Sequence, residues 1–200
     1  MREYWGKYRG IVVDNEDPLM LGRLQVSVPQ VLGEVMTAWA MPCVPYAGLE
    51  VGFCMMPPIG TALWVEFEGG DLDYPIWTGC YWREGERPAV ADPPTMRMIQ
   101  TSSCRLLLDD APGEGGFELS VTDPAVAVPI TLKASSEGVS IRLAEISISL
   151  TESGVVITAE PARLAVETAG IGIEHGSARI EAVEPEVSVS ASVVTLPTAT

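Results

Sequence analysis

The sequence predicts an all-β protein in which a compact N-terminal barrel precedes a needle-like β-helix. Short alternating runs of β-branched and aromatic residues fill the first 82 positions, and a 16-residue repeat fills the last 70 or so. No segment shows the 3.6-residue period of an amphipathic helix. Every aromatic residue except Phe117 lies within residues 1–82, so two different architectures share the chain.

Four segments of the first half have the composition of β-strands, at residues 8–13, 22–28, 62–67 and 75–82. Clusters of Asp, Asn, Pro and Gly separate them, as expected for turns. About five strands in roughly 80 residues indicate a small barrel or sandwich.

Two local features explain how these strands are connected. Pro18 presets φ and Gly22 permits a left-handed turn between the first two strands. In the third strand, Leu63, Val65 and Phe67 alternate and therefore share one face, which we expect to be buried.

The order of the motifs resembles a known family. YRGIVVDNEDPLMLGRLQVSVPQVLG is followed by WAMPCVPYAG and MMPPIGTALWVEFEGGDLDYPIWTGCYW, and LLLDDAPGEGG follows at residues 106–116. Together they are similar to the oligosaccharide/oligonucleotide-binding (OB) barrel and connecting hairpin of phage baseplate assembly protein V, the contractile-tail central spike and the valine-glycine-repeat spike of type VI secretion. The resemblance covers residues 4–82 almost without a gap. It implies an OB-fold barrel followed by a triple-stranded, trimeric β-helix needle.

The second half contains a repeat of 16 residues. Gly138, Gly154 and Gly170 are each 16 positions apart, and Glu186 occupies the next equivalent position. Offsets +1, +3, +8 and +10 from these positions are aliphatic in every repeat, ending at Val194 and Leu196. This predicts two short strands per repeat, each with one apolar and one polar face. The residues expected to form a trimer core are Val139, Ile141, Ile146, Ile148, Val155, Ile157, Leu164, Ile171, Ile173, Ile180, Val187 and Val189.

A single ribbon of this kind leaves its apolar face in water. We therefore expect three identical chains to pack these faces around one axis and to pair their edge strands with each other. A single-chain solenoid is the alternative. Glutamates recur every seven or eight residues from Glu137 to Glu181, and we expect them near the turns, where they would oppose sideways pairing.

The predicted domains follow from changes in composition. Residues 84–95 are charged, rich in proline and without a period, which is typical of a linker. The barrel is expected over residues 1–83, a connecting β-hairpin region over 96–129 and the repetitive β-helix spike over 130–200.

The charge distribution excludes some classes of partner. The net charge is −15, and acidic residues exceed basic ones in both halves of the chain. Nucleic acids and anionic bilayers would be repelled, so we expect neither nucleic-acid binding nor stable membrane insertion. The N-terminus has no apolar leader and no run approaches the roughly 18 apolar residues of a membrane span, which predicts synthesis in the cytoplasm.

Candidate catalytic residues are few. Glu66, Glu68, Asp71 and Asp73 cluster near one turn, and a glycosidase needs such a pair of carboxylates. Some phage spikes of the resembled family carry a lysozyme domain, but this chain has no helical segment to host one. We therefore expect no enzyme activity and no catalytic residues.

Metal and thiol chemistry are also not expected. Some spike tips of the resembled family bind iron through a His-x-His pair, whereas His175 stands alone and is interpreted as a solvated turn residue. Cys43, Cys54, Cys80 and Cys104 show no CxxC spacing, so we expect reduced and mostly buried thiols. No metal and no other cofactor is predicted.

The resemblance implies a structural central spike of a contractile injection system or phage baseplate. In such a spike a homotrimer links the tube and hub to the tip and helps to pierce the target envelope. The barrel would contact a separate hub protein, and a separate tip-capping protein would bind the C-terminal end. The alternative is an OB-fold binding module for an oligosaccharide or oligonucleotide, although the barrel lacks the basic residues that such grooves use.

Overall fold

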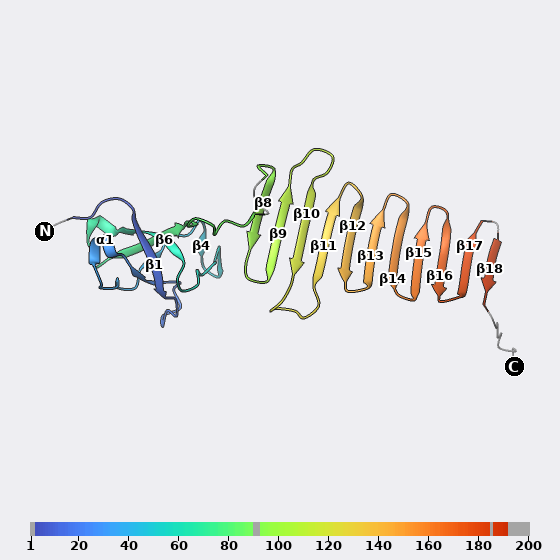
Figure 1. Ribbon diagram of the computed structural model, residues 1–200, viewed down its shortest axis with the longest axis horizontal. Coiled ribbons are helices and arrows are strands. Elements are labelled where there is room, and N and C mark those ends of the chain that lie inside the picture. The colour runs from blue at the N-terminus through green and yellow to red at the C-terminus, as the bar shows by residue number, and fades with distance from the viewer. Residues whose placement is uncertain (1–2, 90–92, 185, 192–200) are drawn as a thin grey trace. The chain divides into compact units, whose positions relative to one another are not determined.

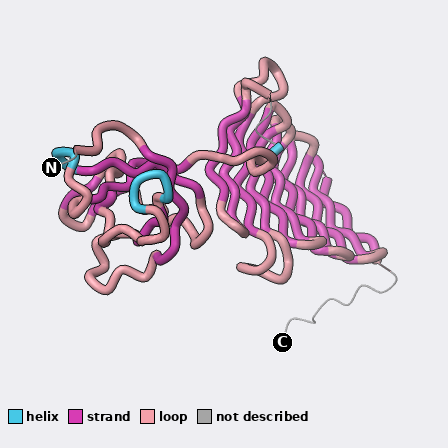
Figure 2. Tube along the Cα trace, turned by 60° about the vertical axis from the view of Figure 1, so that its left-hand side comes forward, coloured by secondary structure: helices cyan, strands magenta, loops and turns pink. Residues whose placement is uncertain are grey.

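The computed structural model describes residues 3–89, 93–184 and 186–191. Contacts divide the chain into two compact units, Met1–Arg87 and Pro88–Thr200. Both units are built mainly of β-strands (Figures 1 and 2), which confirms the predicted fold class. Within the described ranges, no helix is long and apolar enough to span a membrane.

The N-terminal unit contains a curled five-stranded sheet of the OB type, in the order β2-β1-β6-β7-β3. Neighbouring strands are antiparallel except for β3 and β7, which are parallel. The five strands are β1 Tyr8–Asp14, β2 Gln25–Ser27, β3 Met41–Pro42, β6 Ala62–Phe67 and β7 Pro75–Cys80. The four strands predicted from the sequence correspond to β1, β2, β6 and β7.

Smaller elements complete this unit. A four-residue helix, α1, spans Pro29–Leu32, and a single 3₁₀ turn, η1, spans Glu68–Gly70. A two-stranded hairpin is formed by β4 Ala47–Gly48 and β5 Val51–Gly52. The short helix and the hairpin were not predicted, because neither is long enough to show a hydrophobic period.

The core of the N-terminal unit lies inside the curl of the sheet. Leu63 and Val65 are fully buried and Phe67 is 5% exposed, which confirms that these three residues share a buried face. Val12 of β1 and Trp77 of β7 pack in the same cluster. Each buried aliphatic side chain contributes about 1.5–3 kcal/mol, so this cluster is a main source of the stability of the unit.

The C-terminal unit is an antiparallel sheet of eleven strands, each paired with the next strand in the sequence (Figure 1). The strands are β8 Met96–Gln100, β9 Cys104–Asp109, β10 Gly116–Val121, β11 Ile130–Ser135, β12 Gly138–Leu143, β13 Ile146–Thr151, β14 Gly154–Ala159, β15 Ala162–Glu167, β16 Gly170–His175, β17 Ala178–Val183 and β18 Glu186–Ser190. The predicted hairpin region and the predicted repeat therefore lie in one continuous sheet.

The 16-residue repeat corresponds to two strands and their turns. Each strand from β11 to β17 has six residues, and two residues separate it from the next. β14 begins at Gly154, whose φ is +146, and a Cβ there would collide with the carbonyl oxygen of Val166 in the next strand. Gly138 and Gly170 are placed in the same way. Glycine therefore recurs every 16 residues because the backbone of the next strand approaches too closely for a Cβ at these positions.

The sequence analysis missed one member of this glycine series. Gly116 opens β10 with a φ of +154, and a Cβ there would collide with the carbonyl oxygen of Ala134. The longer connection between β10 and β11 breaks the 16-residue spacing, which hid the equivalence. Glu186 occupies the glycine position at the start of β18, where no further described strand approaches.

The described part of the C-terminal unit is a single layer (Figure 2), since its strands contact their sheet neighbours and no second layer covers either face. Pairing of edge strands between chains was expected, but the chain itself pairs β9 to β17 on both sides. It is also not a closed solenoid, because β8 and β18 lie at opposite edges of the sheet. Val194 and Leu196, the last aliphatic positions of the predicted repeat, lie outside the described residues.

The expectation of buried cysteines was wrong. Cys43, Cys54, Cys80 and Cys104 are all free and exposed. Cys43 and Cys54 lie in loops, and the other two lie at strand ends, Cys80 closing β7 and Cys104 opening β9. These positions lie outside the buried centres of the strands, which explains the exposure.

Candidate functional site

The register of the eleven-stranded sheet places aliphatic side chains in a continuous central row. Residues that lie opposite each other in adjacent strands project from the same face of a sheet. One such residue comes from every strand, and all are Ile, Leu or Val. The central row is Ile99, Leu106, Leu119, Leu132, Ile141, Ile148, Ile157, Leu164, Ile173, Ile180 and Val189.

Two flanking rows project from the same face. One contains Leu108, Phe117, Ala134, Val139, Leu150, Val155, Val166, Ile171, Ala182 and Val187. The other contains Val121, Ile130, Leu143, Ile146, Ala159, Ala162, His175 and Ala178. We call the central row and these two rows the apolar face. All twelve residues predicted as a trimer core lie on it.

The sequence analysis missed part of the apolar face. Leu143, Leu150 and Val166 are third alternating positions of their strands, and they continue the pattern of the two positions that were recognised. The residues of β8 to β10 were missed because these strands precede the 16-residue period. Extending the alternation by two residues within each strand would have identified Leu143, Leu150 and Val166 from the sequence.

The apolar face is exposed in one copy of the chain. Ile141 is 41% exposed, Ile157 38% and Ile173 49%. Eleven strands of about six residues cover roughly 50 Å by 20 Å, so the face measures about 1,000 Å². Monomeric proteins rarely expose apolar patches larger than a few hundred Å², whereas a stable interface buries about 800 Å² on each partner. The size of this face is therefore typical of an assembly surface.

The opposite face is polar and carries its own ion pairs. Arg179 lies 2.7 Å from Glu181 and 3.4 Å from Glu174, and Arg163 lies 3.4 Å from Glu167. Ion pairs of this kind are partly exposed, and such pairs contribute little to stability. They keep this face hydrated, which distinguishes it from the apolar face.

The expected position of the glutamates was only partly right. Glu137, Glu145, Glu152 and Glu160 lie in two-residue turns. In contrast, Glu167, Glu174 and Glu181 lie within β15, β16 and β17, on the polar face. The alternation of the strands places these three next to arginines, which the seven-to-eight-residue spacing did not reveal.

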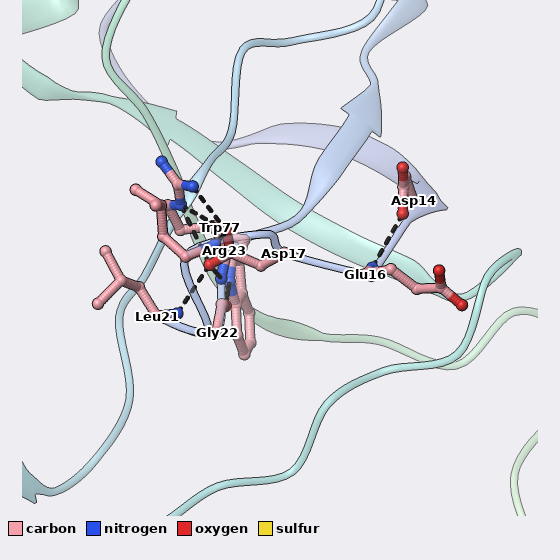
Figure 3. Close-up of polar contacts among 8 residues, drawn as sticks. Asp14, Glu16, Asp17, Leu21, Gly22, Arg23 and Trp77 are labelled. Atoms are coloured by element: carbon pink, nitrogen blue, oxygen red, sulfur yellow. Dashed lines mark hydrogen bonds and ion pairs between the residues drawn. The ribbon is translucent and has the colours of Figure 1, made fainter.

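In the N-terminal unit, Asp17 organises the turn between β1 and β2 (Figure 3). Its side chain is 3% exposed and accepts hydrogen bonds from the backbone N–H groups of Leu19, Leu21 and Arg23 at 3.0, 2.8 and 3.2 Å. Nη2 of Arg23 lies 2.6 Å from Oδ1 of Asp17. The Arg23 side chain, aided by these backbone donors, holds the pKa of Asp17 well below its usual range.

This turn is also fixed to the core. Gly22 has a φ of +76, as the predicted left-handed turn requires, and its carbonyl oxygen accepts a hydrogen bond of 3.0 Å from Nε1 of Trp77. The ordered turn presents Met20, which is 91% exposed, at its tip. Asp17 and Arg23 therefore have a structural role in shaping a surface.

An exposed apolar surface lies beside this turn. A hollow of about 390 Å³ is lined by Leu21, Tyr46, Phe53, Met56, Trp77 and neighbouring residues. Tyr46 is 59% exposed and Phe53 46%. Aromatic and methionine side chains are enriched at protein interfaces, so we name this surface the barrel hollow and regard it as a second candidate contact region.

The outer face of the barrel carries an aromatic and basic cluster. The Arg9 guanidinium lies over the rings of Trp64 and Tyr81, at 5.8 and 5.7 Å from their centroids. Aromatic rings on the surface of a barrel can stack against bases or sugars. Here the guanidinium already covers both rings, which reduces the aromatic surface open to a ligand.

The candidate catalytic carboxylates do not form an acid–base pair aimed at a common point. Glu66 forms an ion pair with Lys7 at 2.8 Å, and Oδ1 of Asp71 accepts a hydrogen bond from the backbone N–H of Asp73 at 3.1 Å. Glu68 lies in the 3₁₀ turn. Their observed contacts are those of a turn and an exposed ion pair.

The interpretation of His175 as a turn residue was wrong. It is the last residue of β16 and shares the apolar face with Ile171 and Ile173, because alternate residues of a strand project the same way. The ranges that the structure describes contain no group of three or more His, Cys, Asp or Glu side chains that could hold a metal ion.

Comparison with known proteins supports the resemblance for the N-terminal unit. Residues 8–82 match the family described as the type VI secretion system/phage-baseplate injector OB domain. This confirms the predicted relationship over those residues and indicates a structural, typically non-enzymatic, role in a phage baseplate or type VI spike. A search of curated proteins finds no match.

Proposed function

We propose that this chain is the subunit of a homotrimeric central spike in a contractile injection system or phage baseplate. The observation that supports this function most strongly is the exposed apolar face, whose central row continues in one register across all eleven strands of the C-terminal unit, whereas Arg97 of β8 occupies the flanking position opposite Leu108. The match of residues 8–82 to an injector OB domain supports the assignment to a particle of this type.

The choice of side chains on the apolar face favours three copies. Three sheets around an axis enclose a triangular space that is widest opposite the middle of each sheet and narrows where two sheets meet. The central row carries Ile or Leu in every strand before β18, whereas the flanking rows include alanines such as Ala134, Ala159, Ala162 and Ala182. Long side chains would thus fill the centre at every level, and the alanines would allow two sheets to approach closely at the levels where they occur.

The mechanical role follows from the backbone pairing. Every strand from β9 to β17 is hydrogen-bonded on both sides, so neighbouring strands cannot separate without breaking a ladder. Eleven strands spaced about 4.8 Å apart give a rod roughly 50 Å long. Three such sheets packed on one core would form a narrow, stiff needle that concentrates force on a target envelope.

The two ends of the spike would bind different partners. The barrel hollow presents exposed aromatic and methionine side chains, which support attachment of a separate hub protein to the N-terminal unit. At the other end, β18 pairs with β17 alone among the described strands and so offers an open edge. A tip-capping protein would satisfy that edge. No enzyme activity is required for this role.

The competing function is an OB module that binds an oligosaccharide or oligonucleotide. The cluster of Arg9, Trp64 and Tyr81 is the observation in its favour. The net charge of −15 opposes oligonucleotide binding. A ligand-binding monomer would also leave the apolar face unexplained.

Native mass distinguishes the two functions. We expect a particle of three times 21.4 kDa by light scattering or native mass spectrometry at micromolar concentration and neutral pH. A monomer that binds an oligosaccharide or oligonucleotide would contradict the spike and favour the OB module. A stable dimer would contradict the triangular arrangement.

A further inference from the structure

His175 is the only histidine in the chain, and it lies on the apolar face. It closes β16 and is placed opposite Ala162 of β15 and Ala178 of β17. Its side chain is exposed in one copy, as are Ile171 and Ile173 of the same strand face. An imidazole at this point would be removed from water if the apolar face is covered.

The row that contains His175 changes composition around it. β11, β12 and β13 contribute Ile130, Leu143 and Ile146 to this row, whereas β14, β15 and β17 contribute alanines. A hollow of about 270 Å³ lies beside the imidazole, lined in part by Ile173, Ala178 and Val189. Small neighbours therefore leave space for a polar ring on a face that elsewhere carries large aliphatic groups.

No charged side chain shares the apolar face with His175 along the described residues between Ile130 and Ser190, because the other members of that face are aliphatic. Arg163, Glu174 and Arg179 belong to the polar face, where Glu174 is paired with Arg179 at 3.4 Å. Glu160 lies in the turn before β15, at the same end of the sheet as His175, since the backbone N–H of Gly176 donates to the carbonyl oxygen of Pro161 in that turn at 3.2 Å. The pair of Glu174 and Arg179 also borders the hollow, where its two charges offset each other.

We propose that His175 makes the association of the three chains dependent on pH, so that the spike is stable at neutral pH and weakens on acidification. This inference rests on the proposed trimer. Threefold symmetry places the three imidazoles at one height along the axis, each on a face whose other described members from Ile130 to Ser190 are aliphatic. Burial disfavours a charged imidazolium, and imidazole side chains change charge between about pH 5 and 8. Protonation therefore favours separated chains over the assembly.

The test compares association at pH 7.5 and pH 5.5 in four full-length proteins. These are the natural chain, His175→Gln, His175→Leu and the double variant His175→Gln with Thr158→His. Gln is polar but does not titrate in this range. Leu is similar in size to His and has the apolar character of the other residues on the apolar face. The double variant keeps one histidine but moves it to the polar face, since Thr158 lies opposite Arg163 there.

We expect the natural chain to dissociate at a protein concentration at least about tenfold higher at pH 5.5 than at pH 7.5. The other three proteins should lack this difference. Light scattering over a dilution series measures the association. Because the chain has one histidine, its ring resonances in NMR also report protonation directly, and they should shift over the same pH range as dissociation.

The outcomes separate this inference from the proposed function. A natural chain that is trimeric at both pH values, or that shows the same pH dependence as His175→Gln, would overturn the role of His175 and leave the trimer intact. A natural chain that is monomeric at pH 7.5 would overturn the trimer itself. Equal pH dependence in the double variant and the natural chain would show that the position of the histidine does not matter.

Discussion

Ile157 of β14 lies directly opposite Leu164 of β15 in the central row, and each side chain is 38% exposed. The next residue along β14, Thr158, lies opposite Arg163 on the polar face. Ile157 and Thr158 are adjacent in one strand but lie on opposite faces of the sheet. The same substitution at the two positions therefore tests the two faces separately.

Ile157→Asp should prevent trimer formation. Three carboxylates would meet in an aliphatic core, and each unpaired buried charge costs several kcal/mol, at least about 3. We expect a monomer at micromolar concentration by light scattering, whereas Thr158→Asp should remain a trimer. If both variants stay trimeric, the apolar face is not the interface.

Gly154→Ala should destabilise the sheet. The positive φ and the approach of the Val166 carbonyl oxygen leave no room for a Cβ, and strain of this kind costs about 1–3 kcal/mol. Gly172→Ala is the matched control, because a Cβ there meets no atom within 4 Å. Thermal and denaturant unfolding should show a clear loss for the first variant and a change within about 0.5 kcal/mol for the second. Equal losses would contradict this account of the glycine repeat.

Asp17→Asn should lower the melting temperature of the N-terminal unit by several degrees at pH 7. Arg23 lowers the pKa of folded Asp17, so the stabilisation is fully present above the pKa of an unfolded aspartate, about 3.9, and is lost as the pH falls toward the lower folded value. The difference between Asp17→Asn and the natural chain should therefore shrink below about pH 4.

Asp14→Asn is the control for this measurement. Asp14 accepts a hydrogen bond of 2.9 Å from the backbone N–H of Glu16, and within the described ranges it forms no ion pair with an arginine. We expect a smaller effect at pH 7. A melting-temperature difference for Asp17→Asn that persists unchanged at pH 2 would refute the role of the Asp17 charge.

A chain that ends at Pro129 should separate the two partner contacts. It retains the barrel hollow and β8 to β10 but lacks β11 to β18. We expect it to co-purify with the hub protein and to lose the tip-capping protein. Loss of hub binding, with the barrel shown to be folded by its near-ultraviolet circular dichroism, would mean that the repeat contributes to docking.

Neither oligonucleotide nor cell-wall glycan should be bound or cleaved. Acidic residues outnumber basic ones 27 to 12, so a phosphate backbone would be repelled at physiological salt. Fluorescence anisotropy with single-stranded DNA and a reducing-sugar assay on peptidoglycan measure the two properties. Micromolar binding that Trp64→Ala abolishes would support the OB module instead.

The sequence alone determined the longer strands of the barrel and the strands of the repeat, with most of their apolar sides, because local alternation and turn residues are properties of neighbouring positions. It identified β1, β2, β6 and β7, the buried side of Leu63 and Val65, and the 16-residue period. It also contained the motifs that resemble the injector OB domain. These features need no knowledge of which strand lies beside which.

Only the tertiary structure decided how the strands pair, because register depends on contacts between distant residues. Pairing within one chain aligned Ile99 through Val189 into one row, and it brought Gly154 against the Val166 carbonyl oxygen. It also moved His175 from an expected turn to the apolar face, since β16 continues for six residues before it turns. Whether the last residue of a strand still belongs to the paired ladder decides whether it follows the alternation, and composition does not encode where the ladder ends.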